Sequence, residues 1–183
     1  MKKHFVKEYE NTLTVNHKGK VVNQVIYKGD YYCSSKEEKK ELLSLSVLFI
    51  GIMLIAFFIN GCVSSQSSNV LYIALPYVAY FLPFVYMIMG IYRLMKNPLK
   101  MEKIQKEHSY DRILRCSIGI LVLSVLGVLG SIIYLVTNKQ IIHILTEVRF
   151  LCLNAIIGMV SFLLLRYVSK SRKKLQIEAR TKK

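Results

Sequence analysis

Residues 42–60 read LLSLSVLFIGIMLIAFFIN, an uninterrupted apolar run without Asp, Glu, Lys or Arg. A helix of this length rises about 28 Å, close to the roughly 30 Å hydrocarbon core of a bilayer. Three further runs of the same character follow at 70–95, 113–137 and 150–168, and their few charged residues stand near their ends. The sequence therefore predicts an all-α polytopic membrane protein with four transmembrane helices.

The distribution of positive charge predicts the orientation of these helices. Of the 26 Lys and Arg residues, 24 lie in the segment before the first run, around the connection between the second and third, or in the tail. The other two connections hold only Lys139 and Arg149. Because positive residues are retained on the cytoplasmic side, we expect cytoplasmic N- and C-termini in the plasma membrane, with outer hairpins at 61–69 and 138–149.

The segment before the first run resembles a small soluble element. Thr12–Asn16, Lys20–Tyr27 and Tyr31–Cys33 have strand-like compositions and are separated by turn-forming residues. This pattern predicts a cytoplasmic three-stranded β-meander. Because so short a segment cannot bury much apolar surface, we expect it to dock on the membrane, on the rest of the chain or on another protein.

The limits of the first helix are also marked in the sequence. The stretch 34–38, SSKEE, combines an N-cap signal with an acidic first turn, so a helix is expected to begin there. Asn60-Gly61 would end it, because both residues tolerate the left-handed conformation at a helix C-terminus.

Three regions follow from these boundaries. Residues 1–41 form the cytoplasmic N-terminal segment, 42–169 the four-helix transmembrane domain, and 170–183 a basic cytoplasmic tail. Basic residues beside the inner leaflet are attracted to its anionic lipids, and the tail residues expected to contact their headgroups are Lys170, Arg172, Lys173 and Lys174. The net charge of +15 is explained in this way. No nucleic-acid partner is expected, because no basic domain with interleaved aromatic residues stands apart from the membrane runs.

Small and polar residues predict where the helices approach one another. The stripe in 113–137 contains Ser124, Gly127 and Ser131, and the stripe in 150–168 contains Asn154, Gly158 and Ser161. Small side chains let helix backbones pack closely in a membrane. The amide of Asn154 needs a hydrogen-bond partner there, and serines of the third run or tyrosines of the second are available.

The second run is unusual in its prolines and aromatic residues. Pro76 and Pro83 each remove a backbone donor and can bend the helix, and Tyr80 lies between them on the same face. These residues either shape the packing of the helix or line a groove for a lipid or an apolar ligand.

Several functional classes are excluded by what the runs lack. Proton- or ion-coupled transport normally needs an ionisable residue inside the membrane, and none lies in the interior of a run. The four histidines stand far apart and no Cys-x-x-Cys pair is present, so the nucleophile, metal and redox arrangements of enzymes are missing. We therefore expect no enzyme activity, and no catalytic, metal-binding or cofactor-binding residues. A disulfide between Cys62 and Cys152 is geometrically possible.

The expected function is contact with another protein. The sequence favours a non-catalytic accessory, assembly or immunity-type subunit that binds another membrane protein, or a second copy of itself, among membrane lipids. The alternative is a small facilitator or channel for a lipid or apolar solute, lined by the second run. A third reading is an enzyme whose active groups come from a partner chain.

Overall fold

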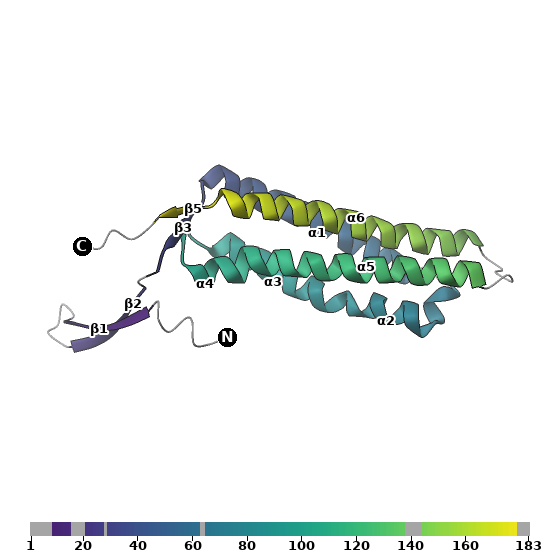
Figure 1. The fold of residues 1–183 in the computed structure, drawn as a ribbon, viewed down its shortest axis with the longest axis horizontal. Coiled ribbons are helices and arrows are strands. Elements are labelled where there is room, and N and C mark those ends of the chain that lie inside the picture. The colour runs from purple at the N-terminus through teal and green to yellow at the C-terminus, as the bar shows by residue number, and fades with distance from the viewer. Residues whose placement is uncertain (1–8, 16–20, 28, 63–64, 138–143, 179–183) are drawn as a thin grey trace.

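A computed structural model of the chain describes residues 9–15, 21–27, 29–62, 65–137 and 144–178. It contains four helical segments that are long and apolar enough to cross a membrane, and these form one elongated bundle (Figure 1). The segments are α1 (Lys36–Cys62), α2 with α3 (Leu71–Ala79 and Phe81–Lys96), α4 with a π turn and α5 (Lys103–Lys106, Glu107–Asp111 and Arg112–Thr137), and α6 (Ile144–Lys174). The predicted all-helical class with four such helices is confirmed.

The start of α1 is set by a serine cap. The backbone N–H of Glu38 donates to Ser35 Oγ at 3.1 Å, which satisfies one of the donors that a helix N-terminus leaves without a partner. Glu37 and Glu38 place negative charge in the first turn, where the helix dipole favours it. The predicted N-cap signal is confirmed, and α1 ends at Cys62, two residues beyond Asn60.

The second helical segment is interrupted between its two prolines. Helix α2 ends at Ala79, α3 begins at Phe81, and Tyr80 joins them. Pro83 has no N–H to donate to the carbonyl of Ala79 four residues earlier, and its ring would crowd that carbonyl. Pro76 lies inside α2 without ending it, so the interruption follows from Pro83.

Helix α6 is longer than its apolar run. It begins at Ile144, whereas the run 150–168 predicts a start at Phe150. Glu147 and Arg149 therefore lie on the helix and not in an outer hairpin, and the rest of that predicted hairpin, 138–143, lies outside the described residues. A continuous helix bonds its backbone groups internally, which is the favourable arrangement beside an apolar environment.

The strands differ from the predicted meander. Strands β1 (Tyr9–Val15) and β2 (Val21–Tyr27) form an antiparallel hairpin in which Tyr9 is opposite Tyr27. The strand β3 (Tyr31–Cys33) does not extend this hairpin. It pairs instead with β4 (Lys100–Met101) on one side and β5 (Gln176–Glu178) on the other. The expectation of one three-stranded meander was wrong because β3 finds its partners in distant parts of the chain.

These strands distinguish the two ends of the bundle. We call the end that carries β3, β4 and β5 the sheet end, and the opposite end, with the short 3-10 helix η2 (Ser67–Asn69), the loop end. The hairpin β1–β2 extends beyond the sheet end (Figure 1). The starts of α1 and α5 and the ends of α3 and α6 all lie at the sheet end, so the described parts of the three positively charged segments meet there.

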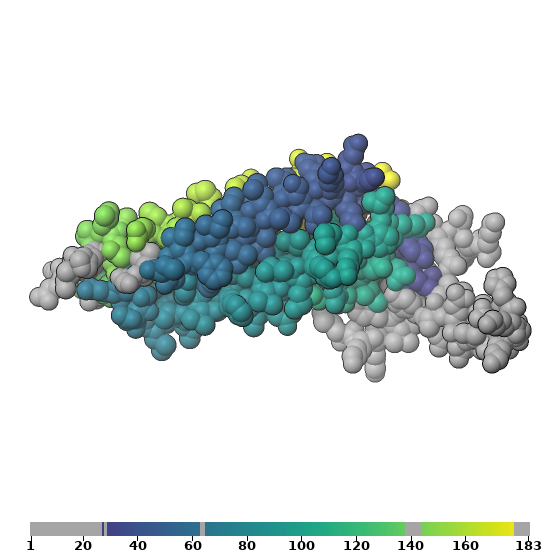
Figure 2. Space-filling model, turned by 180° about the vertical axis from the view of Figure 1, so that it is seen from behind, coloured from purple at the N-terminus to yellow at the C-terminus, as the bar shows by residue number. Residues whose placement is uncertain are grey.

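The core lies along the axis of the bundle, where α6 packs against both α1 and α5. On the face seen in Figure 2, α1 lies beside the second helical segment. The largest side chains that are fully buried are Tyr80, Tyr110, Phe150, Leu42, Met53, Ile73, Met87, Leu94, Met101, Ile113, Ile120 and Ile157. Many large apolar side chains point outward instead, as expected of a protein whose surface faces lipid.

Polar contacts join the helices at the sheet end. Lys39 Nζ of α1 donates to the carbonyl oxygens of Met95, at 3.3 Å, and of Asn97. The Asn97 amide Nδ2 donates in turn to the Gln105 carbonyl at 3.1 Å and to Ser109 Oγ at 3.2 Å. The turn after α3 is thereby held to both α1 and the π turn.

Two helical glycines provide a test of how closely α5 and α6 pack. A Cβ at Gly158 of α6 would lie 2.2 Å from Ser124 Oγ and 3.0 Å from Ser124 Cβ, whereas a Cβ at Gly51 of α1 would meet nothing within 4 Å. We predict that Gly158→Ala lowers the free energy of unfolding in detergent by about 1–3 kcal/mol through overpacking. Gly51→Ala is the matched control, and we expect it to be neutral or to stabilise by up to about 1 kcal/mol. Equal effects of the two substitutions would contradict the close approach.

Candidate functional site

Polar and small residues form a continuous contact between α5 and α6, which we call the seam. It consists of Ser117, Ser124, Gly127, Asn154, Gly158 and Ser161, all of them buried. Ser124 Oγ donates to the backbone carbonyl of Asn154 at 2.8 Å, and Ser161 Oγ donates to the backbone carbonyl of Ser117 at 2.8 Å. The two helices are thus joined by a hydrogen bond in each direction.

Asn154 extends the seam to the second helical segment. Asn154 is only 1 % exposed, and its Nδ2 donates to the Phe150 carbonyl at 3.3 Å. Tyr80 OH donates to Asn154 Oδ1 at 3.4 Å. A Cβ at Gly127 would lie 3.4 Å from the same oxygen. The structure therefore gives Asn154 a tyrosine partner from the second segment, one of the two partner types that the sequence offers.

The remaining predicted seam residue bonds within its own helix. Ser131 Oγ donates to the Gly127 carbonyl at 2.8 Å. Such a bond to the residue four positions earlier satisfies the hydroxyl in an apolar environment without joining two helices. Ser131 therefore does not form a hydrogen bond across the seam within the described residues.

The residues of the second segment lie inside the bundle. Pro76 is buried and Pro83 is half-buried beside Gly119 of α5. Tyr80 is fully buried, and its ring packs on the rings of Phe57 and Phe84, with centroids 6.2 Å and 5.9 Å away. This aromatic packing fills the space beside the interruption of the helix, so the Tyr80 ring lies in the core and not on the surface of the bundle.

An apolar groove of about 350 Å³ instead lies between α5 and α6, on the surface of the bundle. We define it by the residues that line it, which are Leu121, Ser124, Val125, Val128, Leu129, Ala155, Gly158, Met159 and Phe162. On the α6 side, Ala155 and Gly158 leave room for the groove, because neither has a long side chain that would fill it. This groove is not among the features predicted from the sequence. The signal that could have indicated it is the pair of small residues Ala155 and Gly158, three positions apart on α6.

At the loop end, a buried carboxylate holds the connection between α1 and α2. Glu147 is 3 % exposed, and its Oε1 accepts the backbone N–H groups of Gln66, at 2.6 Å, and Ser67, at 3.3 Å. These donors lie at the start of η2, where unpaired N–H groups attract negative charge. Glu147 was missed because the sequence placed it in a hairpin, although it is the one acidic residue between Thr137 and Phe150.

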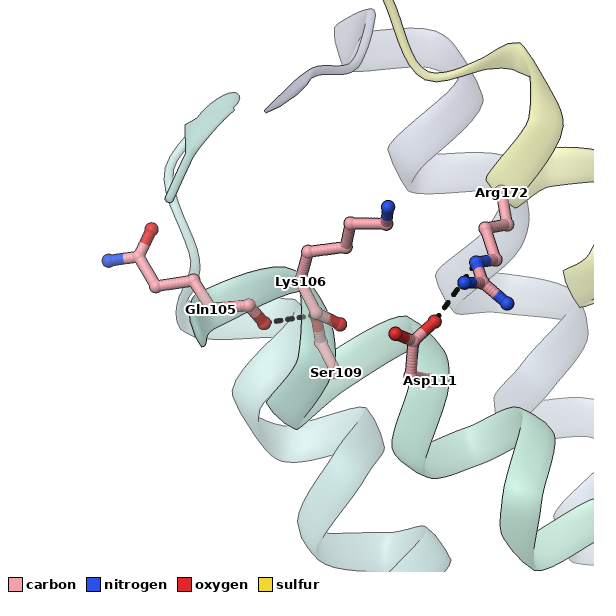
Figure 3. A network of polar contacts seen from close by, with 5 residues as sticks. All are labelled: Gln105, Lys106, Ser109, Asp111 and Arg172. Carbon is pink, nitrogen blue, oxygen red and sulfur yellow. Dashed lines mark hydrogen bonds and ion pairs between the residues drawn. The ribbon is translucent and has the colours of Figure 1, made fainter. Parts of the chain in front are cut away.

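At the sheet end, two of the four tail cations predicted to contact lipid are paired with carboxylates. Arg172 Nε lies 3.0 Å from Asp111 Oδ1 (Figure 3), and Lys174 Nζ lies 3.9 Å from Glu38 Oε1. Lys170 lines a cavity of about 80 Å³ together with Glu38 and other residues of α1 and α6. Lys173 is exposed. The tail cations therefore neutralise acidic side chains of the bundle in part.

Lys106 of α4 lies close to the Arg172 pair (Figure 3). Its ammonium group is 3.9 Å from the centre of the Tyr32 ring in β3. Partial burial lowers the pKa of Lys106 below its usual value. Asp111 opposes this shift and Arg172 adds to it. The cation and its aromatic neighbour connect the small sheet to the start of the third helical segment.

No protein-family model, no curated protein and no solved structure matches this chain. Within the described residues, no group of three or more His, Cys, Asp and Glu side chains is placed to hold a metal ion. The chemistry of the seam is therefore that of hydroxyl and amide groups bonded to backbone and to one another.

The contact between Tyr80 and Asn154 can be measured with a double-mutant cycle. We predict that Tyr80→Phe and Asn154→Ala are non-additive, with a coupling energy of about 0.6 kcal/mol and at most about 1.7 kcal/mol, the average and the maximum found for hydrogen bonds between membrane helices. The free energy of unfolding of the full chain in detergent is the measurement. Tyr77→Phe serves as the control partner, because Tyr77 OH donates to the Phe57 carbonyl at 2.8 Å and not to Asn154. A coupling that is no larger than that of the control would rule out the contact.

Proposed function

We propose that this chain is an integral protein of the plasma membrane with both termini in the cytoplasm. Four helices of sufficient length and apolarity support its insertion. The segments that hold 24 of the 26 Lys and Arg residues converge on the sheet end in their described parts, which favours a cytoplasmic position for that end.

We further propose that the protein is non-catalytic and acts as an accessory, assembly or immunity-type subunit through contact with another membrane protein. The polar side chains of the seam support this function because they are already engaged within the bundle. Ser124 and Ser161 bond backbone carbonyls across the seam, and Asn154 bonds Tyr80 and Phe150. Within the seam, these polar side chains are therefore not free to bind a substrate.

The groove between α5 and α6 is the observation that carries this proposal. It is apolar, open to the surface and bordered on α6 by Ala155 and Gly158. Helices associate in a bilayer where small residues let their backbones come close. We propose that a transmembrane helix of the partner lies in this groove and covers Val125 and Met159, which are exposed in the single chain.

The alternative, a facilitator lined by the second helical segment, has less support. Its expected path residues include Tyr80, which is fully buried in the aromatic packing with Phe57 and Phe84. Flux of a lipid or apolar solute through this segment stays a prediction.

Insertion and orientation are tested by cysteine labelling. Two single-cysteine proteins are made in a cysteine-free background. The first keeps Cys62, which is exposed at the end of α1, and the second carries Lys173→Cys at the end of α6. A membrane-impermeant maleimide applied to intact cells is expected to label the first protein, and to label the second only after the membrane is made permeable. The reverse result would overturn the proposed orientation, and extraction of the chain by alkaline carbonate would overturn insertion.

The groove is tested by crosslinking in native membranes. A photoreactive residue at Val125 or Met159 is expected to give one product of constant added mass, because both positions line the groove. The same residue at Ile52 or Ile55, both exposed on α1, is the control and is expected to give no crosslink to a second protein. Ala155→Phe should abolish the product by filling the groove, without changing the expression of the chain.

Two outcomes would count against a partner helix in the groove. Equal products from groove and control positions would indicate unspecific contact, and lipid adducts alone would indicate that only lipid occupies it. A product with twice the mass of the chain would identify the partner as a second copy of the chain, the homo-oligomer that the sequence also allows.

A further inference from the structure

Three arginines gather at the sheet end where α3 packs along α5. Arg93 lies in the last turn of α3, and Arg112 and Arg115 lie in the first turn of α5. The side chain of Arg112 crosses Gly90 of α3, where a Cβ would lie 3.5 Å from its Cγ and 3.6 Å from its Cδ. Its guanidinium carbon is 5.9 Å from the centre of the Tyr86 ring. Arg112 therefore reaches across the helix contact toward the apolar part of α3.

His108 of the π turn lies beside Arg112. Its Nδ1 lies 3.1 Å from Arg112 Nη2. Burial lowers the pKa of His108, and the positive charges of Arg93, Arg112 and Arg115 lower it further, with Glu107 opposing them. Arg93 lies three positions after Gly90, and Arg115 lies three positions after Arg112, so each shares a helix face with a residue of the contact between Arg112 and Gly90. We call Arg93, His108, Arg112 and Arg115 the arginine site.

The three arginines of the site differ from Arg172 and Lys174, because the described residues give them no carboxylate partner. Arg172 and Lys174 are paired with Asp111 and Glu38. Among the residues that the structure describes, no Asp or Glu side chain forms an ion pair with Arg93, Arg112 or Arg115. Like charges held together repel one another, so an anion bound among them would lower that repulsion.

The surroundings of the site indicate where that anion lies. Tyr86 and Tyr92 of α3 are about half exposed beside the arginines, and Lys96 lies 4.5 Å from the centre of the Tyr92 ring. The exposed surface of α3 next to them is apolar, with Ile88 and Met89 facing outward. Tyrosines and basic side chains above an apolar surface are typical of the headgroup level of a membrane.

We propose that the arginine site binds the phosphate of an anionic phospholipid of the cytoplasmic leaflet, while the acyl chains lie on the exposed apolar surface of α3. Guanidinium groups match phosphate oxygens with two parallel N–H donors, and basic pockets between helices on the cytoplasmic side suit such headgroups. This site is separate from the predicted contacts of the tail. The inference rests on the proposed membrane insertion.

The experiment compares two triple variants of the full chain that lose the same charge. R93Q/R112Q/R115Q removes the arginine site, and K36Q/K40Q/R166Q removes three exposed cations of α1 and α6 that are not among the predicted lipid contacts of the tail. Each protein is purified in mild detergent, and binding of phosphatidylglycerol and of phosphatidylcholine is measured by native mass spectrometry. We expect the first variant to bind phosphatidylglycerol about a hundredfold more weakly than the unchanged protein, at roughly a factor of five for each cation. The second should change binding by less than about tenfold.

Further measurements keep the proposal falsifiable. R93K/R112K/R115K keeps the charge but loses the paired donors, and we expect it to bind with intermediate strength. Thermal unfolding of every variant shows whether it is folded. If the glutamine variant R93Q/R112Q/R115Q is unfolded, its loss of binding is not counted, and the binding strength of R93K/R112K/R115K tests the site instead. Equal weakening by the two charge-matched variants would overturn the site, because it would indicate diffuse attraction.

The source of the phosphate is tested by competition. If inorganic phosphate or glycerol phosphate displaces phosphatidylglycerol at equal concentration, the site recognises a soluble anion and the lipid assignment is wrong. Failure of the membrane proposal has a different signature, since carbonate would then extract the unchanged chain from membranes. A chain that resists extraction but binds both lipids equally would contradict the arginine site alone.

Discussion

The contact of Ser124 with Gly158 sets how closely α5 and α6 approach, and much of the bundle depends on that distance. Because Gly158 has no side chain, Ser124 Oγ reaches the Asn154 carbonyl at 2.8 Å. Asn154 is then placed to accept from Tyr80 OH of the second helical segment. Unsatisfied polar groups are costly in an apolar interior. The hydroxyl and amide groups of the seam therefore restrict which arrangements of the helices are acceptable.

Both ends of the bundle are closed by contacts between segments that are distant in sequence. At the loop end, Glu147 of α6 holds the backbone of Gln66 and Ser67. At the sheet end, β3 pairs with strands from the connection after α3 and from the tail, and Arg172 pairs with Asp111. The sheet end thus joins three segments that the sequence shows only as separate basic stretches. A partner bound at any of them would contact the same structure.

The basic residues fall into two classes according to their surroundings. Arg172 and Lys174 have carboxylate partners within the bundle, whereas the arginine site has none among the described residues. Paired cations contribute to holding the tail against α1 and the π turn, and unpaired cations leave a field that attracts an anion. Counting the Lys and Arg residues along the chain cannot distinguish these two classes, because the count does not show which cations have a carboxylate partner. The groove lies on the contact between α5 and α6, and the arginine site on the contact between α3 and α5, so the proposed partner helix and lipid headgroup would not compete for one surface.

The sequence by itself determined the features that depend on neighbouring residues. The four apolar helices follow from the length and composition of each run, the cap at Ser35 from its own stretch, and the interruption at Tyr80 from the missing donor of Pro83. Tertiary structure alone decided the partners of β3, the pairing of Asn154 with Tyr80, and the position of Glu147 on α6. Strand pairing and contacts across helices depend on the rotation and depth of every helix, which are set by packing throughout the bundle and not by local sequence.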